Sequence, residues 1–554
     1  MNYELLADLL FPDVVEDIDH YENLYPARKL PKDAQVLRIA PSPTGFIHLG
    51  NLYGALADER IAHQSNGVFY LRIEDTDSKR LVKGAVDTII STFKYFQITF
   101  DEGADVSLNN GNDYGPYYQR QRVDIYQCYA KSLVKRGLAY PCFCTEAELK
   151  VQRDKQQKAK LATGYYGDWA VCRHLDMATI KEKLQNHEPF VIRLRSSGDI
   201  NHKHTFFDEI KGEITVIEND QDIILLKADG IPTYHFAHAI DDHLMHTTII
   251  LRGEEWLGTL PVHLELFKVL GFELPKYAHT SQLMKMDNGK KRKLSKRKDP
   301  ELSLDFYRQL GYHHYAVKLY LMTLLNWNFE EWFIKHPDTD LTEFKFSLSK
   351  MGQSGALFDL DKLNNISKTY LSKMSVDQMY DYLYDFVVAN EPKLKSSYFN
   401  DQKYLEDIIS LGMGMNLKKR RKDYIFAKQI LSSISYYFDD LYTPEYDFKY
   451  EPKLTANIIE LFLNSYNYDD DNNEWFNKLK EISTKLGFAA DMSQYRAEPD
   501  KYPGNISDIA EVIRVATTGM KNTPDLWAIM QIMGHKRVIN RLDQALIYLQ
   551  GLKK

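Results

Sequence analysis

Two patterns of apolar and polar residues divide the chain near residue 310. Before that point short apolar runs alternate with helical patterns, and after it helical patterns follow one another almost without interruption. The runs "AQVLRIA" (34–40) and "GVFYLRI" (67–73) predict strands, and "NLYGALADERIAHQ" (51–64) between them predicts a helix that Asn51 would cap. Strands that are apolar on both faces are typical of parallel sheets, so this unit predicts a doubly wound α/β domain.

The α/β pattern is interrupted and then resumed. The stretch 119–136 has helical spacing that Gly137 ends, and Thr145 and Glu148 are spaced as a capping box. The runs 190–195 and 213–218 read as strands, and apolar strands with tight turns return at about 226. We therefore expect 36–120 and 226–310 to form two halves of one Rossmann-type domain with a parallel sheet. An α+β insertion over 121–225 would separate them, and an extension over 1–35 would pack on the α/β domain.

The last part of the chain is predicted to be helical throughout. Its long helical patterns, rich in tyrosine and charge, predict an all-α region from 311 to 554. The acidic run "DDDNNE" (469–474) is predicted to be a loop, and no internal repeat is visible.

Composition places the chain among globular proteins of several domains. The 554 residues are 44% hydrophobic and 27% charged, which suits sizeable cores. No apolar run approaches the roughly 20 residues of a bilayer span, so no membrane partner is expected. The acidic start lacks the basic segment of a signal peptide, which makes a cytoplasmic location the expectation. A net charge of −7 means that any nucleic-acid partner would need local basic patches.

The cysteines suggest a metal site. Cys142 and Cys144 are one residue apart, and Cys172 and His174 have the same spacing. This C-x-C…C-x-H pattern is a complete tetrahedral set and predicts one structural Zn²⁺. The alternative is that the clustered cysteines are small buried apolar residues. Cys128 lies on the apolar face of a helix and is expected in the core.

Two loops stand out by their chemistry. "RIAPSPTGFIHLGN" (38–51) turns sharply after a strand and places His48 at a helix start, although Pro and Gly punctuate many such connections. "GKKRKLSKRKD" (289–299) holds seven basic residues. Such a run is either a solvated face or a loop that neutralises the charge of phosphates.

Read together, these loops resemble the HIGH-type and KMSKS-type motifs of class I aminoacyl-tRNA synthetases. With "LRIEDTD", "DGIPTYHFA", "DDHLM" and "RGEEW" in the same order, the chain is similar to bacterial-type glutamyl-tRNA synthetases from about residue 36 to its C-terminus. The resemblance implies an acceptor-binding insertion, a stem-contact region over 311–385 and an anticodon-binding region over 386–554. It also implies ATP, Mg²⁺, L-glutamate and tRNA(Glu) as substrates and cofactors, and a monomer.

Charge alone suggests how such a site would hold glutamate. Free glutamate carries two carboxylates and one ammonium group, so a selective site needs two cations and one anion. Arg38 and Arg252 would grip the carboxylates, and Glu74 would hold the ammonium group. The resemblance adds Ala40, Ser42, Tyr234 and His238 to the same pocket.

The resemblance also assigns the ATP side. His48 and Lys296 would be the catalytic residues, because both would bind phosphates. The full ATP set is His48, Gly50, Glu255, Met284, Lys293, Lys296 and Arg297. The N-terminus of the helix after His48 would favour the phosphates as well.

Basic residues outside the two loops are the candidates for RNA contacts. Phosphate contacts are assigned to Lys418, Lys419, Arg420 and Arg421, with an exposed helix face as the alternative. Arg193, Arg195 and Lys203 in the insertion are weaker candidates. The sequence leaves open whether tRNA(Gln) is also charged. A catalytically silent tRNA-binding paralogue, an enzyme that modifies a tRNA base and a glutaminyl-tRNA synthetase are the rival interpretations.

Overall fold

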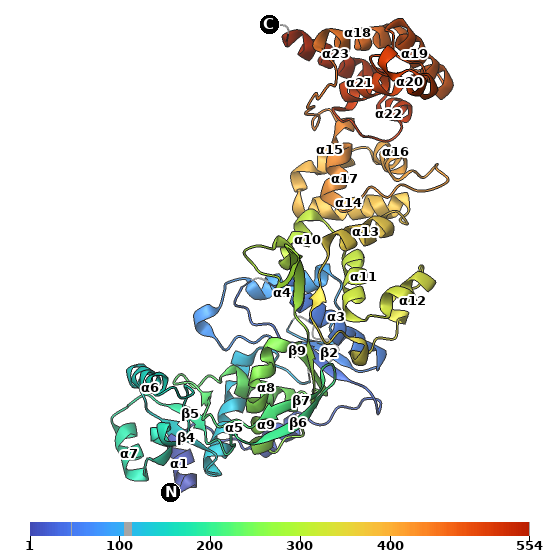
Figure 1. Ribbon diagram of the computed structural model, residues 1–554. Helices are drawn as coiled ribbons and strands as arrows, with labels where there is room; N and C mark the ends of the chain where they lie inside the picture. The colour runs from blue at the N-terminus through green and yellow to red at the C-terminus, as the bar shows by residue number, and fades with distance from the viewer. Residues whose placement is uncertain (46, 105–112, 553–554) are drawn as a thin grey trace. The chain divides into compact units, whose positions relative to one another are not determined.

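A computed structural model describes residues 1–45, 47–104 and 113–552 (Figure 1). The chain forms two compact units, residues 1–307 with 317–360 and residues 308–316 with 361–554. Among the described residues, no helix is both long and apolar enough to cross a bilayer.

A parallel sheet forms the centre of the first unit. Strands β1 (Val36–Ile39), β2 (Val68–Leu71) and β3 (Glu102–Gly103) run parallel, and helix α3 (Leu49–Gln64) connects β1 to β2. Beside β1 lies the parallel pair β9 (Ile249–Gly253) and β10 (Lys276–Thr280), because the amide of Thr248 donates to the carbonyl of Val36. The predicted parallel α/β domain is confirmed. Strands β1, β2 and β9 are largely buried, which fits their mostly apolar residues.

The start of α3 differs from the prediction. The helix begins at Leu49, so His48 rather than Asn51 is its N-cap residue. The side chain of Asn51 instead accepts a hydrogen bond from the backbone N–H of His48 at 3.0 Å. In this bond a polar residue at the third helical position accepts from the backbone of the N-cap residue. The sequence pattern did not distinguish this role of Asn51 from that of the N-cap itself.

Further helices and strands complete the α/β part of the first unit. They are α4 (Ala85–Tyr95), α8 (Tyr234–Leu244), α9 (Leu260–Leu270), α10 (Leu304–Leu310), α11 (His314–Leu325), α12 (Phe329–Lys335), and the strands β11 (Leu283–Asp287), β12 (Lys290–Lys293) and β13 (Ala356–Leu357). The end of α10 from residue 308 and the start of α11 up to residue 316 belong to the second unit. Residues 317–360 belong to this unit: Arg60 of α3 donates to the carbonyls of Thr342 and Phe344, and β13 pairs with β11. The structure therefore divides the predicted region 311–385.

The N-terminal extension is helical and packs on its neighbours. Helices α1 (Tyr3–Leu10) and α2 (Ile18–Leu24) lie against α5 (Val123–Lys135), the first helix of the insertion. Glu22 of α2 joins the extension to α5 and α8, because its carboxylate accepts a hydrogen bond from Tyr129 of α5 and contacts His243 of α8. The extension thus shares one apolar core with the insertion and the α/β domain.

The insertion is an α+β structure. Strands β4 (Ala139–Cys142), β5 (Val191–Leu194) and β8 (Ile224–Leu226) form an antiparallel sheet, accompanied by α6 (Glu146–Lys158) and α7 (Met177–Gln185). The capping box of Thr145 and Glu148 begins α6 as predicted. A hairpin of β6 (Lys203–Asp208) and β7 (Gly212–Ile217) reaches the α/β domain, where Val216 packs with Ile250 and Tyr277.

The described part of the second unit is helical around one apolar core. Its helices are α13 (Leu360–Leu371), α14 (Val376–Asn390), α15 (Lys395–Phe399), α16 (Gln402–Met413), α17 (Ala427–Ile434), α18 (Pro452–Ser465), α19 (Asn472–Lys485), α20 (Met492–Ala497), α21 (Ile506–Thr518), α22 (Leu526–Met533) and α23 (His535–Gly551). The boundary predicted between 385 and 386 falls inside α14. The acidic run 469–474 is only partly a loop, because Asp471 and Glu474 form the capping box of α19.

Candidate active site

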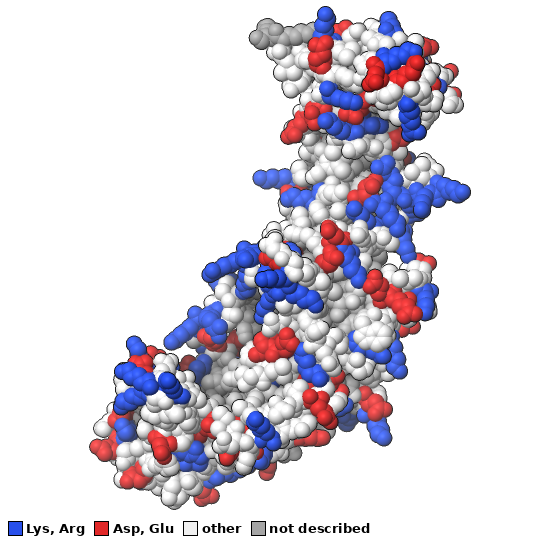
Figure 2. Space-filling view, in the orientation of Figure 1, with Lys and Arg blue, Asp and Glu red and all other residues white. Residues whose placement is uncertain are grey.

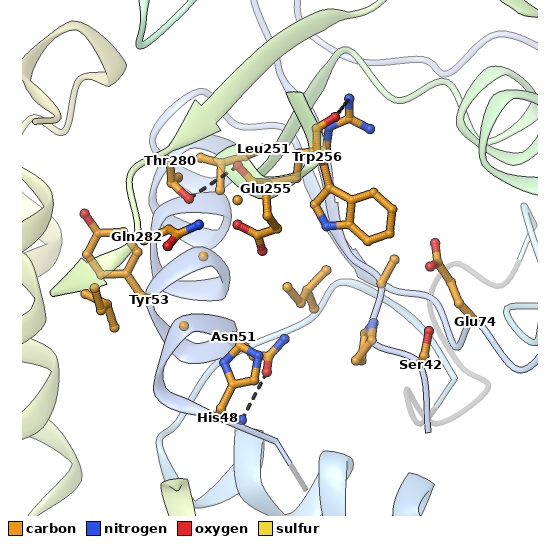
Figure 3. A pocket seen from close by; sticks show the side chains of 18 of the residues that line it. Ser42, His48, Asn51, Tyr53, Glu74, Leu251, Glu255, Trp256, Thr280 and Gln282 are labelled. Atoms are coloured by element: carbon orange, nitrogen blue, oxygen red, sulfur yellow. Dashed lines mark hydrogen bonds between the residues drawn. The ribbon is translucent and has the colours of Figure 1, made fainter. Parts of the chain in front are cut away.

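A cavity of about 680 Å³ lies in the first unit, where strands of the parallel sheet end. Ligands of open α/β sheets bind at the carboxyl ends of the strands, where the chain crosses to opposite sides of the sheet. Here β1 lies between β2 and β9, so the turn from β1 into α3 occupies that point. Figure 3 shows Glu74 and Ser42 on one side of this cavity and Tyr53 and Gln282 on the other, with Glu255 between them.

Most of the residues predicted from sequence line this one cavity. They are Arg38, Ala40, Ser42, His48, Gly50, Glu74, Tyr234, Arg252, Glu255, Lys293 and Lys296. They come from segments as far apart as the first strand and the β12 loop. The fold therefore brings both signature loops to the same pocket.

The turn into α3 creates a site for an anion. The N-terminus of α3 faces the cavity through His48 and Gly50, and a helix N-terminus attracts negative charge. Burial lowers the pKa of His48, and the nearby Lys296 lowers it further. The ring is therefore neutral at pH 7 and can donate one N–H. Gly50 leaves room for this ring, because a Cβ atom there would lie 3.0 Å from His48 Nδ1.

One side of the cavity contains a buried network of charges. Asp242 of α8 is fully buried and accepts hydrogen bonds from Arg38 at 3.1 and 3.3 Å and from Arg72 at 2.7 Å. Arg72 also donates to Glu74 at 3.3 Å. Burial nevertheless raises the pKa of Glu74 to about 7. Asp242 was not assigned a role from sequence, although it lies in the segment "DDHLM".

Arg252 is held by two histidines. Its Nε donates to His279 Nε2 at 2.9 Å and its Nη1 donates to His263 Nδ1 at 2.8 Å. Because arginine only donates, both ring nitrogens must be unprotonated acceptors. His279 then carries its proton on Nδ1, which donates to Asp208 of the β6–β7 hairpin at 2.6 Å.

The remaining donors of Arg252 fit a carboxylate. A third N–H is directed at the carbonyl of Trp256 at 3.4 Å. Of the five guanidinium N–H groups, one on each terminal nitrogen remains. Those two can grip a carboxylate in the planar bidentate geometry that arginine favours. Sequence reasoning missed the supporting histidines and Asp208, because these partners meet only in the folded chain.

Three predicted residues do not line the cavity. His238 is fully buried one helical turn beyond Tyr234, where it contacts Asp242 and Tyr277. The backbone carbonyl of Met284 is already bonded to Phe358 at 2.7 Å, because Met284 lies in the small β11 sheet. Arg297 is exposed, since the tight turn after Ser295 presents its neighbour Lys296 to the cavity instead.

The insertion brings three thiols together. The sulfur atoms of Cys142, Cys144 and Cys172 all lie within 4.8 Å of one another. The hydroxyl of Tyr165 lies 3.4 Å from the first sulfur and 3.3 Å from the second. Interaction with Cys144 and Cys172 lowers the pKa of the Cys142 thiol.

The fourth predicted metal ligand is not in this cluster. His174 is exposed, and the oxygen next to the sulfurs is the hydroxyl of Tyr165. The short 3₁₀ helix Val171–His174 explains the difference. Residues two apart in such a helix point in different directions, so an inward Cys172 turns His174 outward.

The predicted RNA-binding residues lie in an irregular segment after α16 and not on a helix face. Arg420 donates to the carbonyls of Ser372 and Met374, so its side chain has a structural contact. Arg421 pairs with Asp423 at 2.7 Å. Lys418 and Lys419 are exposed, and Figure 2 shows Lys and Arg side chains gathered on this part of the second unit. In the insertion, Arg193 is buried and bonded to the carbonyl of Asp222, whereas Lys203 is exposed.

Comparison with protein families gives two matches. Residues 35–365 match the family model for tRNA synthetases class I (E and Q), catalytic domain. Residues 503–546 match an anticodon binding domain, which lies within the helical second unit.

Individual relatives match along nearly the whole chain. A glutamate–tRNA ligase of Acetivibrio thermocellus is 51% identical over 549 residues, covering 99% of this chain and 100% of the relative. A glutamate–tRNA ligase of Clostridium perfringens is 44% identical, covering 98% and 100%. The crystal structure of a glutamate tRNA ligase from Elizabethkingia meningosepticum in complex with its amino acid superposes with a TM-score of 0.71 at 25% identity, covering 93% and 99%.

Proposed function

The chain belongs to the class I tRNA synthetases, in the E and Q family, and from this premise we propose that it acts as a glutamate–tRNA ligase. The supporting observation is the single cavity, which unites a neutral histidine at a helix N-terminus, a cationic loop, two arginines and a buried carboxylate. Its volume is in the range of ligand pockets.

The reaction has two steps and needs no protein nucleophile. An oxygen of the α-carboxylate of L-glutamate attacks the α-phosphorus of ATP, which forms glutamyl adenylate and releases pyrophosphate. A hydroxyl of the 3′-terminal ribose of tRNA then attacks the activated carbonyl carbon, which forms glutamyl-tRNA and releases AMP. Catalysis comes from positioning the reactants and from stabilising charge.

Each side of the cavity has a part in the first step. Arg38 and Arg252 hold the carboxylates of glutamate, and Glu74 holds its ammonium group. His48 and Lys296 bind the phosphates and stabilise the negative charge that moves to pyrophosphate. Mg²⁺, when bound, neutralises further phosphate charge. Glu255, which lines the cavity together with His48 and Lys296, is the carboxylate that would hold this ion.

The simplest test is glutamate-dependent exchange of pyrophosphate into ATP. Purified enzyme should catalyse this exchange with L-glutamate and not with L-glutamine or L-aspartate, measured with and without tRNA. A silent paralogue would bind tRNA but show no exchange with any of the three amino acids.

The acceptor is proposed to be tRNA(Glu), with tRNA(Gln) as the alternative second acceptor. The exposed Lys418 and Lys419 would contact RNA phosphates, and the family match at residues 503–546 supports anticodon binding in the second unit. Charging assays with both purified tRNAs distinguish the two scopes. We also propose a monomer that works in the cytoplasm, where ATP and tRNA are available.

The thiol cluster is proposed to hold one structural Zn²⁺. Three thiol sulfurs and a phenol oxygen supply four converging donors, which suits tetrahedral zinc. We expect Cys172→Ser to lose the zinc and to lower the Tm by about 5 °C or more, because metal binding is coupled to folding of the insertion. Metal analysis and calorimetry measure both effects.

Two further variants test whether Tyr165 or His174 is the fourth zinc ligand. Tyr165→Phe should reduce zinc retention during dialysis against a chelator, whereas His174→Ala should retain zinc like the unmodified protein. The reverse result would restore His174 as the ligand.

Glu74 should make glutamate binding depend on pH. Only the deprotonated carboxylate attracts the ammonium group, and a pKa of about 7 means that protons compete for Glu74 below neutral pH. We therefore expect the KM for glutamate to rise about eightfold from pH 7.5 to pH 6, at saturating ATP. Glu74→Gln should bind glutamate weakly with little pH dependence. A flat profile for the unmodified enzyme would contradict this role.

A further inference from the structure

The loop that carries Lys296 is tied at its base by a buried carboxylate. The loop follows β12 (Lys290–Lys293) and ends at Asp299, whose side chain is 1% exposed. Asp299 lies next to a segment with seven basic residues. A buried carboxylate in such a place has to be fully paired, because an unpaired buried charge is strongly unfavourable.

Asp299 is paired to both ends of the loop. Its Oδ2 accepts from Arg292 Nη1 at 2.6 Å and from the backbone N–H of Ser295 at 2.8 Å, and its Oδ1 accepts from Arg292 Nη2 at 2.8 Å. The backbone N–H of Asp299 donates to the carbonyl of Ser295 at 3.0 Å. One carboxylate therefore joins β12, the start of the turn and its end.

Neighbouring contacts reinforce this junction. Arg292 Nε also donates to Asp287 at 2.6 Å, and Lys285 lies 3.7 Å from Asp299 while it bonds to Glu301. Asp287 and Lys285 belong to β11, the strand that pairs with β12. These contacts lower the pKa of Asp299, with Arg292 as the first cause, so the group stays ionised at neutral pH.

The geometry determines where Lys296 can point. Leu294 is buried, and its backbone N–H donates to the carbonyl of Leu283 at 3.2 Å. Lys296 is an exposed residue of the Ser295–Asp299 turn, which follows directly on the anchored Leu294, and it lines the cavity. Without the carboxylate, repulsion among the basic residues would favour an open loop.

We propose that Asp299 and Arg292 are positioning residues that hold the signature loop with Lys296 facing the cavity. Neither side chain lines the cavity, so each acts through the loop and not on the substrate. The kinetic part of this inference rests on the proposed role of Lys296 in phosphate binding. The structural part, that the carboxylate holds the loop closed, does not depend on that role.

The kinetic test uses Asp299→Asn, Arg292→Gln and the double variant. We expect Asp299→Asn to lower kcat/KM for ATP in pyrophosphate exchange about 10- to 100-fold, with the KM for glutamate within twofold of the unmodified enzyme. The double variant should be no worse than Asp299→Asn, because the two residues act as one unit. Lys291→Gln is the matched control, since it removes one positive charge from the same strand and should stay within twofold.

Limited digestion with trypsin tests the loop itself. Cleavage after the Lys and Arg residues within 293–298 should be at least fivefold faster in Asp299→Asn than in Lys291→Gln. Circular dichroism checks that both variants are folded. If Asp299→Asn folds poorly, the same digestion is measured in Arg292→Gln, because Arg292 is partly exposed. Unchanged cleavage in both variants would overturn the proposal. Faster cleavage with unchanged kinetics would support the proposal that Asp299 holds the loop and would contradict the proposed function of Lys296.

Discussion

Replacing Lys296 with alanine should lower kcat for glutamate-dependent pyrophosphate exchange about 10²- to 10³-fold. The cavity places this ammonium group on the same side as His48 and Glu255. Negative charge moves onto pyrophosphate as the bond to the α-phosphorus breaks, and removing one preorganised donor to such charge typically costs about that factor. Steady-state exchange with saturating glutamate measures the loss.

A matched control separates this effect from a general loss of positive charge. Lys298 is exposed in the same loop, two residues further on, and does not line the cavity. Lys298→Ala should therefore retain exchange within about twofold, as is usual for surface substitutions. Equal rates for Lys296→Ala and the unmodified enzyme would refute the phosphate role of this loop.

Replacing Arg252 with glutamine should lower kcat/KM for glutamate about 10²- to 10³-fold and leave the KM for ATP nearly unchanged. Arg252 is 8% exposed and lines the cavity, and two of its five N–H groups remain after the contacts with His279, His263 and Trp256. Removing one partner of a buried charged pair typically costs about 3–5 kcal/mol, which corresponds to that range or more.

Two further variants test the geometry of this arginine. Arg252→Lys keeps the charge but loses the planar fork, so it should recover only a small part of the activity. Arg153→Gln changes an exposed arginine of the insertion and should leave the KM for glutamate unchanged. If Arg252→Gln changed the KM for ATP and not that for glutamate, Arg252 would have to be reassigned to the nucleotide.

Local features of the fold follow from the order of residues. The apolar runs around Leu37 and Phe69 require burial on both faces, which gave the parallel sheet. Thr145 and Glu148 satisfy the first N–H groups of α6 from within four residues, so their spacing alone predicts the helix start. Asn51 shows the limit of this reasoning, since the same residue type serves as a cap or as the third helical residue.

The chemical identity of the cavity was also predictable in part. Two guanidinium groups, one carboxylate and a cationic loop are complementary to glutamate and a triphosphate, whatever their arrangement. The order of the motifs then placed them in a known family. Position in the motif did not decide which residues reach the cavity, however, because His238 and Arg297 lie in matching segments and do not line it.

The amino-acid sequence by itself determined the elements of this protein, its parallel sheet and the types of charge in its site, because these depend on neighbours a few residues away. Only the tertiary structure decided which side chains support the site. Asp208, His279 and Arg252 meet from three separate strands, and Tyr165 rather than His174 lies beside the thiols. The directions of buried side chains are fixed by packing between distant segments, and that packing has no signature in any local run of residues.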